Sequence, residues 1–219
     1  MNSSPSDKPL ILIGAGGHGR VLLDIIQLRC LNIIGIIDKE LEKSEICGVK
    51  VLGNDDVIER YSPKDVQLIN GIGSIADITL RKNIYEMYVK KGYTFAAITH
   101  PSTVIGSNVQ LSNGSQVMAG AVIQCGSSIG ENSIINSSSS IDHDCVIGSH
   151  CHIAPGVIMS GGVKVGDGTH ISTGVVIIQG INIGRNVFIA AGSVVTKDIG
   201  EGISVIGSPA REFVLNKNV

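Results

Sequence analysis

The sequence predicts a small α/β domain followed by a parallel β-helix, and three observations lead to this fold class. Every sixth residue from Ile105 to Val195 is aliphatic, with no inserted loop. The third residue after each of these positions is almost always Gly, Asn or Asp, the residues that tolerate positive φ. About 95 residues precede the repeat, and they open with an apolar run, a glycine-rich turn and a helical pattern.

The repeat predicts a triangular prism of short parallel strands. A residue that tolerates left-handed backbone once in every hexad predicts a corner there, with a strand between corners. Gly recurs after the aliphatic position at an eighteen-residue spacing from Gly130 onward, so three hexads make one coil. Hexapeptide periodicity is typical of β-helices. Only Ser138 and His150 depart from the corner composition. The aliphatic positions, which form a thin core, are Ile105, Leu111, Val117, Ile123, Ile129, Ile135, Ile141, Ile147, Ile153, Met159, Val165, Ile171, Ile177, Ile183, Ile189 and Val195.

The start of the chain matches a phosphate-binding pattern. A predicted strand at Pro9–Ile13 leads into a glycine-rich loop and a helix, and a second strand at Asn32–Ile37 ends at Asp38. This is the G-x-G-x-x-G arrangement with an acidic residue about twenty positions further on. The free amides of a helix N-terminus bind anions, so we expect a phosphate-bearing ligand here rather than a tight turn alone. The loop residues are Gly14, Ala15, Gly16, Gly17, His18 and Gly19.

NAD is not the expected ligand. The segment before the repeat holds one mononucleotide-sized half and not the two halves that a dinucleotide spans. Nothing downstream resembles a hydride-transfer site.

The remaining elements of the first domain follow from shorter patterns. We expect an extended segment at 46–53, a short helix at 55–60, a strand at 66–70, a helix at 76–91 and a last strand at 95–98. The Gly71–Gly73 loop follows the 66–70 strand, on the same edge as the first loop if the sheet is parallel. We predict a disordered tail at 1–7, a nucleotide-sugar-binding domain at 8–98 and a β-helix domain at 99–219, with the boundary near His100-Pro101.

Composition limits the classes of function. With 17 Lys and Arg against 19 Asp and Glu, the near-neutral charge disfavours non-specific nucleic-acid binding. No apolar run is long enough to cross a bilayer, and the first residues lack the apolar stretch of a signal peptide. The odd number of cysteines lacks paired metal-site spacing, so we expect free core thiols in a cytoplasmic protein and no metal.

Candidate catalytic residues lie where the repeat does not demand them. His143 stands next to a corner, flanked by Asp142 and Asp144, and an imidazole held by a carboxylate can remove a proton at neutral pH. We interpret His143 as the general base, while Asp144 is equally explained as a corner residue. His152 and His170 are one coil apart and are expected to stack, at a surface or a subunit contact.

The glycine-rich loop, the His-Pro junction and the Asn136–Asp144 run (NSSSSIDHD) together resemble the sugar acetyltransferases of the NeuD/PglD type. The resemblance covers essentially the whole chain, and it implies a left-handed β-helix. It further implies acetyl-CoA as co-substrate, acetylation of a sugar, often the 4-amine of a nucleotide-linked amino sugar, and a homotrimer with sites between subunits.

The resemblance also implies roles for individual residues. His143 becomes the general base, and Asp144 its acidic partner, where the family usually has Glu. Asn136 helps to position the acceptor. The residues implied for acetyl-CoA are His152, near the thioester, with Gly161, Gly180, Ala191, Lys197 and Arg211. The residues implied for the nucleotide part of the acceptor are Gly14, Gly16, Gly17, His18, Gly19, Asp38, Lys39 and Gly73.

Three functional hypotheses remain at this point. The first is direct acetyl transfer to a nucleotide-linked amino sugar; the second is O-acetylation of a sialic acid or polysaccharide on the same fold. The third is a non-catalytic trimeric scaffold that binds sugar nucleotides. Within the enzymatic readings Cys145 is a rival nucleophile, but its inward position argues against it.

Overall fold

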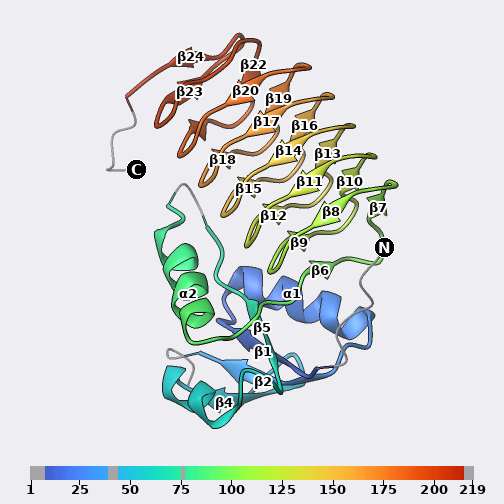
Figure 1. The fold of residues 1–219 in the computed structure, drawn as a ribbon, viewed down its shortest axis with the longest axis vertical. Helices are drawn as coiled ribbons and strands as arrows, with labels where there is room; N and C mark the ends of the chain where they lie inside the picture. The colour runs from blue at the N-terminus through green and yellow to red at the C-terminus, as the bar shows by residue number, and fades with distance from the viewer. Residues whose placement is uncertain (1–7, 39–43, 75–76, 215–219) are drawn as a thin grey trace. The chain divides into compact units, whose positions relative to one another are not determined.

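The computed structural model describes residues 8–38, 44–74 and 77–214. They form two compact units that divide between Pro101 and Ser102 (Figure 1). The predicted tail at 1–7 lies outside the described residues.

The first unit is built on a five-stranded sheet of order β3-β4-β2-β1-β5. Its ladders are parallel except for the β3–β4 pair, which is antiparallel. The elements in chain order are β1 (Leu10–Ile13), α1 (Gly17–Leu28), β2 (Ile33–Ile37), β3 (Glu45–Ile46), β4 (Val49–Gly53), the 3₁₀ helix η1 (Asp55–Arg60), β5 (Gln67–Asn70), α2 (Thr79–Lys90) and β6 (Ile98–Thr99).

Burial explains why the first apolar run forms a central strand. All four residues of β1 are buried, as expected for a parallel strand covered on both faces. Ile11 and Ile13 share a core cluster with Tyr85 of α2 and with Phe95, whose rings lie 4.6 Å apart between centroids. Two elements differ from the prediction. The segment 46–53, expected as one extended stretch, forms the β3–β4 hairpin. The strand expected at 95–98 is reduced to an isolated bridge between Phe95 and Leu68 of β5.

The second unit is the predicted prism of short parallel strands, with coils stacked on one another (Figure 1). Sheet 1 contains β7 (Val104–Ile105), β10 (Val122–Ile123), β13 (Ser140–Ile141), β16 (Ile158–Met159), β19 (Val176–Ile177) and β22 (Val194–Val195). Sheet 2 contains β8 (Gln110–Leu111), β11 (Ser128–Ile129), β14 (Val146–Ile147), β17 (Lys164–Val165) and β20 (Asn182–Ile183). Sheet 3 includes β9 (Gln116–Val117), β12 (Ile134–Ile135), β15 (His152–Ile153), β18 (His170–Ile171), β21 (Phe188–Ile189), β23 (Ser204–Ile206) and β24 (Arg211–Glu212), the last antiparallel.

The corners have the backbone conformation that the repeat predicted. Gly126, Gly162 and Gly180 have φ between 69° and 74°, and Asp144 reaches 57° without being glycine. Ser138 and His150, which break the composition of the column, both have a φ of 58° and turn the same way. Asp198 is the exception, since its φ is not positive. Its carboxylate instead accepts the amide of Asn182 at 2.8 Å.

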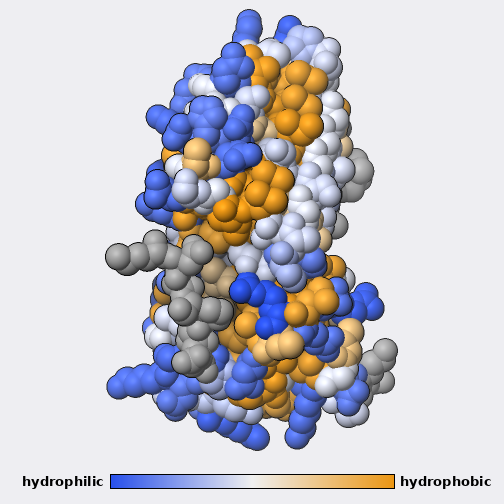
Figure 2. All heavy atoms as spheres, turned by 90° about the vertical axis from the view of Figure 1, so that its right-hand side faces the viewer, coloured by the Kyte–Doolittle hydropathy of each residue, from blue (hydrophilic) through white to orange (hydrophobic). Residues whose placement is uncertain are grey.

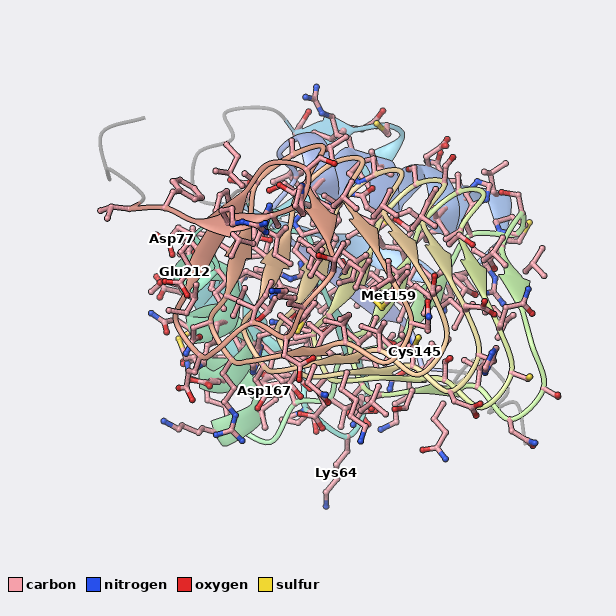
Figure 3. All side chains as sticks on the ribbon, turned by 90° about the horizontal axis from the view of Figure 1, so that it is seen from above. Lys64, Asp77, Cys145, Met159, Asp167 and Glu212 are labelled. Carbon is pink, nitrogen blue, oxygen red and sulfur yellow. The ribbon has the colours of Figure 1, made fainter. Side chains whose placement is uncertain are left out.

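The prism core is aliphatic and includes two thiols. Cys145 and Cys151 are at most 1% exposed, and Figure 3 shows Cys145 and Met159 within the coils. The expectation of core thiols is wrong for Cys30, Cys47 and Cys125, which are exposed; all five cysteines are free.

Close stacking of coils makes Gly130 a stability determinant. A Cβ added there would lie 2.4 Å from the carbonyl carbon of Gly148. This clash is with backbone atoms, so it can be relieved only by moving one coil away from the next. We expect Gly130→Ala to cost about 1–3 kcal/mol or more in the free energy of unfolding. A urea titration that returns the wild-type midpoint would contradict the stacking.

Candidate active site

A His–Asp pair stands at the edge between sheets 1 and 2, in the turn that joins β13 to β14. The Nδ1 atom of His143 lies 2.8 Å from Oδ2 of Asp144, and the Asp142 carboxylate accepts the His143 amide at 2.8 Å. Both side chains of the pair are exposed, 57% for His143 and 73% for Asp144. Because Nδ1–H donates to the carboxylate, Nε2 is the nitrogen left to accept a proton.

The two carboxylates set the basicity of the imidazole. The hydrogen bond that His143 donates to Asp144 is the largest cause that raises the pKa of His143 above 6.5, followed by the charge of Asp142. A raised pKa strengthens the imidazole as a proton acceptor near neutral pH.

Glycines leave room for this pair from both neighbouring coils. A Cβ added at Gly161, one coil on, would lie 2.6 Å from Nε2 of His143, so the ring lies directly against the glycine backbone. A Cβ at Gly126, one coil back, would lie 2.5 Å from an oxygen of Asp144. Beyond Gly161, the added Cβ atoms of Gly162 and Gly180 would meet open space.

A second pair of candidates lies on a different part of the prism. Asn136 begins the turn between sheets 3 and 1, and its Nδ2 lies 3.1 Å from Nε2 of His152 on β15. The predicted one-coil column of His152 and His170 is confirmed, with ring centroids 4.9 Å apart in an edge-to-face arrangement, and Phe188 continues it at 5.5 Å. The expectation of a surface position is wrong, because both histidines are buried within one chain. Burial lowers the pKa of His170 to about 4, which leaves that ring neutral.

The residues implied for acetyl-CoA are spread over both edges and over sheet 3. Gly180 and Lys197 follow His143 and Gly161 along the sheet 1–2 edge, and Ala191 lies on the sheet 3–1 edge with Asn136. Arg211 opens β24. All four of these are exposed. One chain therefore does not bring His143 and Asn136 onto one edge.

The α/β unit brings its two glycine-rich loops together. Gly14 has a φ of 82°, and a Cβ added at Gly19 would lie 2.2 Å from the Gly14 carbonyl oxygen, so both positions require glycine. Asp38 accepts the amide of Ala15 at 2.8 Å. A Cβ at Gly73, in the second loop, would lie 3.2 Å from Cβ of His18. Added Cβ atoms at Gly16 and Gly17 would meet nothing within 4 Å, so the start of α1 is open. Lys39 lies outside the described residues.

A buried arginine beneath the second loop was not anticipated. Arg81 of α2 is 3% exposed and donates to the carbonyl oxygens of Asn70 at 3.0 Å and Ile72 at 2.6 Å. Burial lowers its pKa to about 9. The Asn70 side chain donates a hydrogen bond to the Arg81 carbonyl at 3.0 Å. These reciprocal bonds fix the Gly71–Gly73 loop against α2. An arginine in a helical pattern is ordinarily solvent-facing, which is why the sequence did not single it out.

Cys145 is unsuited to act as the rival nucleophile. Its side chain is buried, its Sγ donates to the carbonyl of Ser160 at 3.3 Å, and burial raises the pKa of the thiol. Among the residues that the structure describes, no group of three or more His, Cys, Asp or Glu could hold a metal ion. None of the helices in the described ranges is long and apolar enough to span a membrane.

The His143–Asp144 pair predicts a specific pH dependence. If His143 acts as the general base, only its neutral imidazole accepts a proton, so kcat is expected to rise with pH through a pKa above 6.5. Asp144→Asn removes the largest cause of the shift, so the rising limb should move to lower pH while the maximal rate falls. A pH–kcat profile of the two proteins decides this. An unmoved limb would mean that Asp144 does not tune the base.

Comparison with family models places each part of the chain. Residues 9–88 match the PglD N-terminal domain, residues 126–161 the bacterial transferase hexapeptide model, and residues 177–197 the hexapeptide repeat of succinyl-transferase. No match is found among curated protein sequences.

Solved structures match over nearly the whole chain. A histidine-to-asparagine variant of perosamine N-acetyltransferase from Caulobacter crescentus, in complex with CoA and GDP-perosamine, has a TM-score of 0.87 and 30% identity, covering 97% of this chain and 100% of that one. The acetyltransferase domain of PglB from Neisseria gonorrhoeae FA1090, in complex with acetyl coenzyme A, has a TM-score of 0.87 and 29% identity, covering 94% and 99%. WeeI from Acinetobacter baumannii AYE has a TM-score of 0.83 and 28% identity, covering 94% and 100%. The chain belongs to the NeuD/PglD-type sugar acetyltransferases, left-handed β-helix enzymes that use acetyl-CoA.

Proposed function

We propose that the chain N-acetylates the 4-amino group of a nucleotide-activated amino sugar in surface glycan biosynthesis, by direct transfer with His143 as general base. The observation that carries this is the 2.8 Å contact between His143 and Asp144 at an exposed edge. The matched Caulobacter enzyme, an N-acetyltransferase described with GDP-perosamine and CoA, supports the acceptor class.

Groups of this chain accept the proton and stabilise the charges that develop during transfer. Nδ1–H of His143 donates to Asp144, which orients the ring and stabilises the imidazolium as Nε2 takes the proton of the attacking amine. The Gly161 N–H donates to no group among the described residues and lies beside the ring, so it is available to stabilise the developing oxyanion. Bound acetyl-CoA would supply the thioester: as the C–N bond forms, the C–S bond breaks, and CoA would leave as a thiol that takes the proton from His143.

The sheet 1–2 edge suits the arm of acetyl-CoA. Beyond His143 it presents the bare backbone of Gly161, Gly162 and Gly180, with Lys197 further along. A thin chain can therefore lie against backbone amides along this edge, and a lysine at its end matches the phosphates of the coenzyme. Arg211 offers a further cation on β24.

The domain at 8–98 is proposed to hold the nucleotide of the acceptor. The open start of α1 presents backbone amides and carries no acidic residue in its first turn, which favours a diphosphate. Gly14, Gly16, Gly17, His18 and Gly19 form this loop, and Asp38, Lys39 and Gly73 complete the proposed site. The β-helix domain at 99–219 is proposed to hold acetyl-CoA.

A homotrimer is proposed because the site is divided in one chain. His143 and Asn136 stand on the two edges that flank sheet 1, and the outer face of sheet 1 is aliphatic at Val104, Val122, Ile158, Val176 and Val194. Figure 2 views this side of the molecule and shows hydrophobic side chains gathered along the prism. Packing these faces about a threefold axis would place His143 of one chain beside Asn136 and His152 of the next.

Ile158 tests the proposed interface. It is 51% exposed at the centre of sheet 1, so Ile158→Asp would bury a charge in the trimer and is expected to give monomers with little turnover. Val146→Asp is the matched control, because Val146 is 45% exposed on the otherwise polar outer face of sheet 2. Sedimentation velocity of both variants tests the interface: Ile158→Asp should sediment as a monomer and Val146→Asp as a trimer. A monomeric wild-type protein would contradict a site shared between subunits.

The acceptor is tested by a panel assay. The protein is incubated with acetyl-CoA and UDP-, GDP- or dTDP-linked 4-amino sugars, or with free sialic acid, and released CoA is followed with a thiol reagent. Turnover with one nucleotide amino sugar supports the proposal and names the nucleotide. Turnover with sialic acid alone would replace it by O-acetylation.

A further inference from the structure

A buried hydroxyl joins the two ends of the turn that bears His143. Ser127 is 0% exposed and lies one coil before Cys145. Its Oγ donates to the carbonyl of Asp142 at 2.9 Å and accepts the amide of Cys145 at 3.0 Å. One side chain therefore fixes the residues on both sides of His143 and Asp144.

The geometry of the His–Asp pair depends on that turn. His143 and Asp144 are sequence neighbours, and their side chains meet at 2.8 Å although Asp144 has a left-handed φ of 57°. Asp tolerates this conformation better than most residues, at a cost of about 1 kcal/mol or less, and the neighbouring coils hold it there. Both side chains are more than half exposed, and their packing is limited to the glycine backbone of the neighbouring coils at Gly161 and Gly126. The backbone of the turn therefore also constrains the pair.

We propose that Ser127 is a positioning residue for His143, which it serves by clamping the Asp142–Cys145 turn from the core. This inference rests on the proposed role of His143 as the base. Ser127 does not touch the reacting atoms and acts through the turn alone.

The prism offers a matched control. Ser133 is also 0% exposed, donates to the carbonyl of Gly148 at 2.8 Å and accepts the amide of Cys151 at 2.9 Å. It clamps the next turn, at the edge between sheets 2 and 3, where no candidate catalytic residue lies. Thr169 makes the same clamp with Gly184 and Val187, at 2.8 and 3.1 Å, so a threonine is compatible with the role.

The experiment compares Ser127→Ala with Ser133→Ala. Each loses one buried hydroxyl that joins the two ends of a turn, and Ser133 also lies 3.4 Å from the carbonyl oxygen of Glu131, so Ser133→Ala should shift the urea midpoint at least as much as Ser127→Ala. Ser127→Ala alone should lower kcat, by about tenfold or more, because a misplaced base loses its geometry, while the KM for acetyl-CoA stays unchanged. Ser127→Thr should restore most of the rate.

The titration of His143, followed by NMR, gives an independent readout. In Ser127→Ala its pKa should fall toward 6.5 as the contact with Asp144 loosens, and in Ser133→Ala it should stay raised. If Ser127→Ala does not fold, Ser127→Cys replaces it, because Cys145 shows that a thiol fits this column, while its weaker hydrogen bonds should loosen the turn and lower both kcat and the pKa of His143 in the same direction.

Equal losses of kcat in the two alanine variants, or an unchanged His143 titration in Ser127→Ala, would overturn the proposal. A failure of the proposed function is distinct, because His143→Ala would then retain turnover whatever Ser127 does.

Discussion

Replacing His143 by alanine is expected to lower kcat by about 10²–10⁴-fold, the usual contribution of a positioned general base. The side chain is exposed and packs into no core, so the variant should fold and bind both substrates as the wild type does. Its residual rate should also lose the rising limb of the pH profile, because the imidazole whose titration produces that limb has been removed. Steady-state kinetics with acetyl-CoA and the acceptor found in the panel measure this.

His150→Asn is the control for the first prediction. His150 also occupies a prism turn, with a φ of 58° and a contact of 3.0 Å to Asn132, and asparagine tolerates that backbone. Its kcat should stay close to that of the wild type. If His143→Ala retained wild-type turnover, the base would have to be sought elsewhere.

Replacing Gly161 by alanine is expected to lower kcat by about 10²-fold, a loss of the size that a 1 Å misplacement produces. The added methyl group would occupy the place of the His143 ring, at 2.6 Å from Nε2 and 2.7 Å from Cε1. The ring is the free end of an exposed side chain, so it moves aside and the prism keeps its stability. This separates Gly161 from Gly130, where the clash is with backbone.

Gly200→Ala controls for adding a methyl group to the prism. A Cβ there would meet only Ile203, at an ordinary 3.6 Å, and its φ is not left-handed. Both variants should unfold at the wild-type urea concentration, and only Gly161→Ala should lose turnover. A crystal structure of Gly161→Ala with the imidazole in its original place would contradict the explanation.

The period of six made the second unit predictable, because one corner and one inward aliphatic residue in every hexad determine how the coils stack. Ser138 and His150 turn like glycine although their side chains are not the preferred ones, since the coils on either side fix their backbone. In the first unit the bounds and types of some elements differ from those that the sequence predicts. Helix α2 begins at Thr79 rather than at residue 76, and 55–60 is a 3₁₀ helix.

The site was predictable only in part. His143 could be singled out because carboxylates flank a histidine that the repeat does not require. Its ring contacts Gly161, and Ser127 bonds to the turn that carries it, but both residues lie one coil away. The sequence did not single them out, because a small residue in a repeat is equally well explained by the fold alone. The position of Arg81 beneath the second loop depends on how α2 packs against β5, which local patterns do not specify.

The most direct test of the shared site is complementation between two inactive variants. His143→Ala and Asn136→Ala chains are unfolded together, refolded in equal amounts and assayed as a mixture. If each site takes His143 from one chain and Asn136 from the next, about a quarter of the interfaces regain both residues, and about a quarter of wild-type turnover should return. Mixed trimers with no recovered activity would contradict the account, because His143 and Asn136 would then have to act within a single chain.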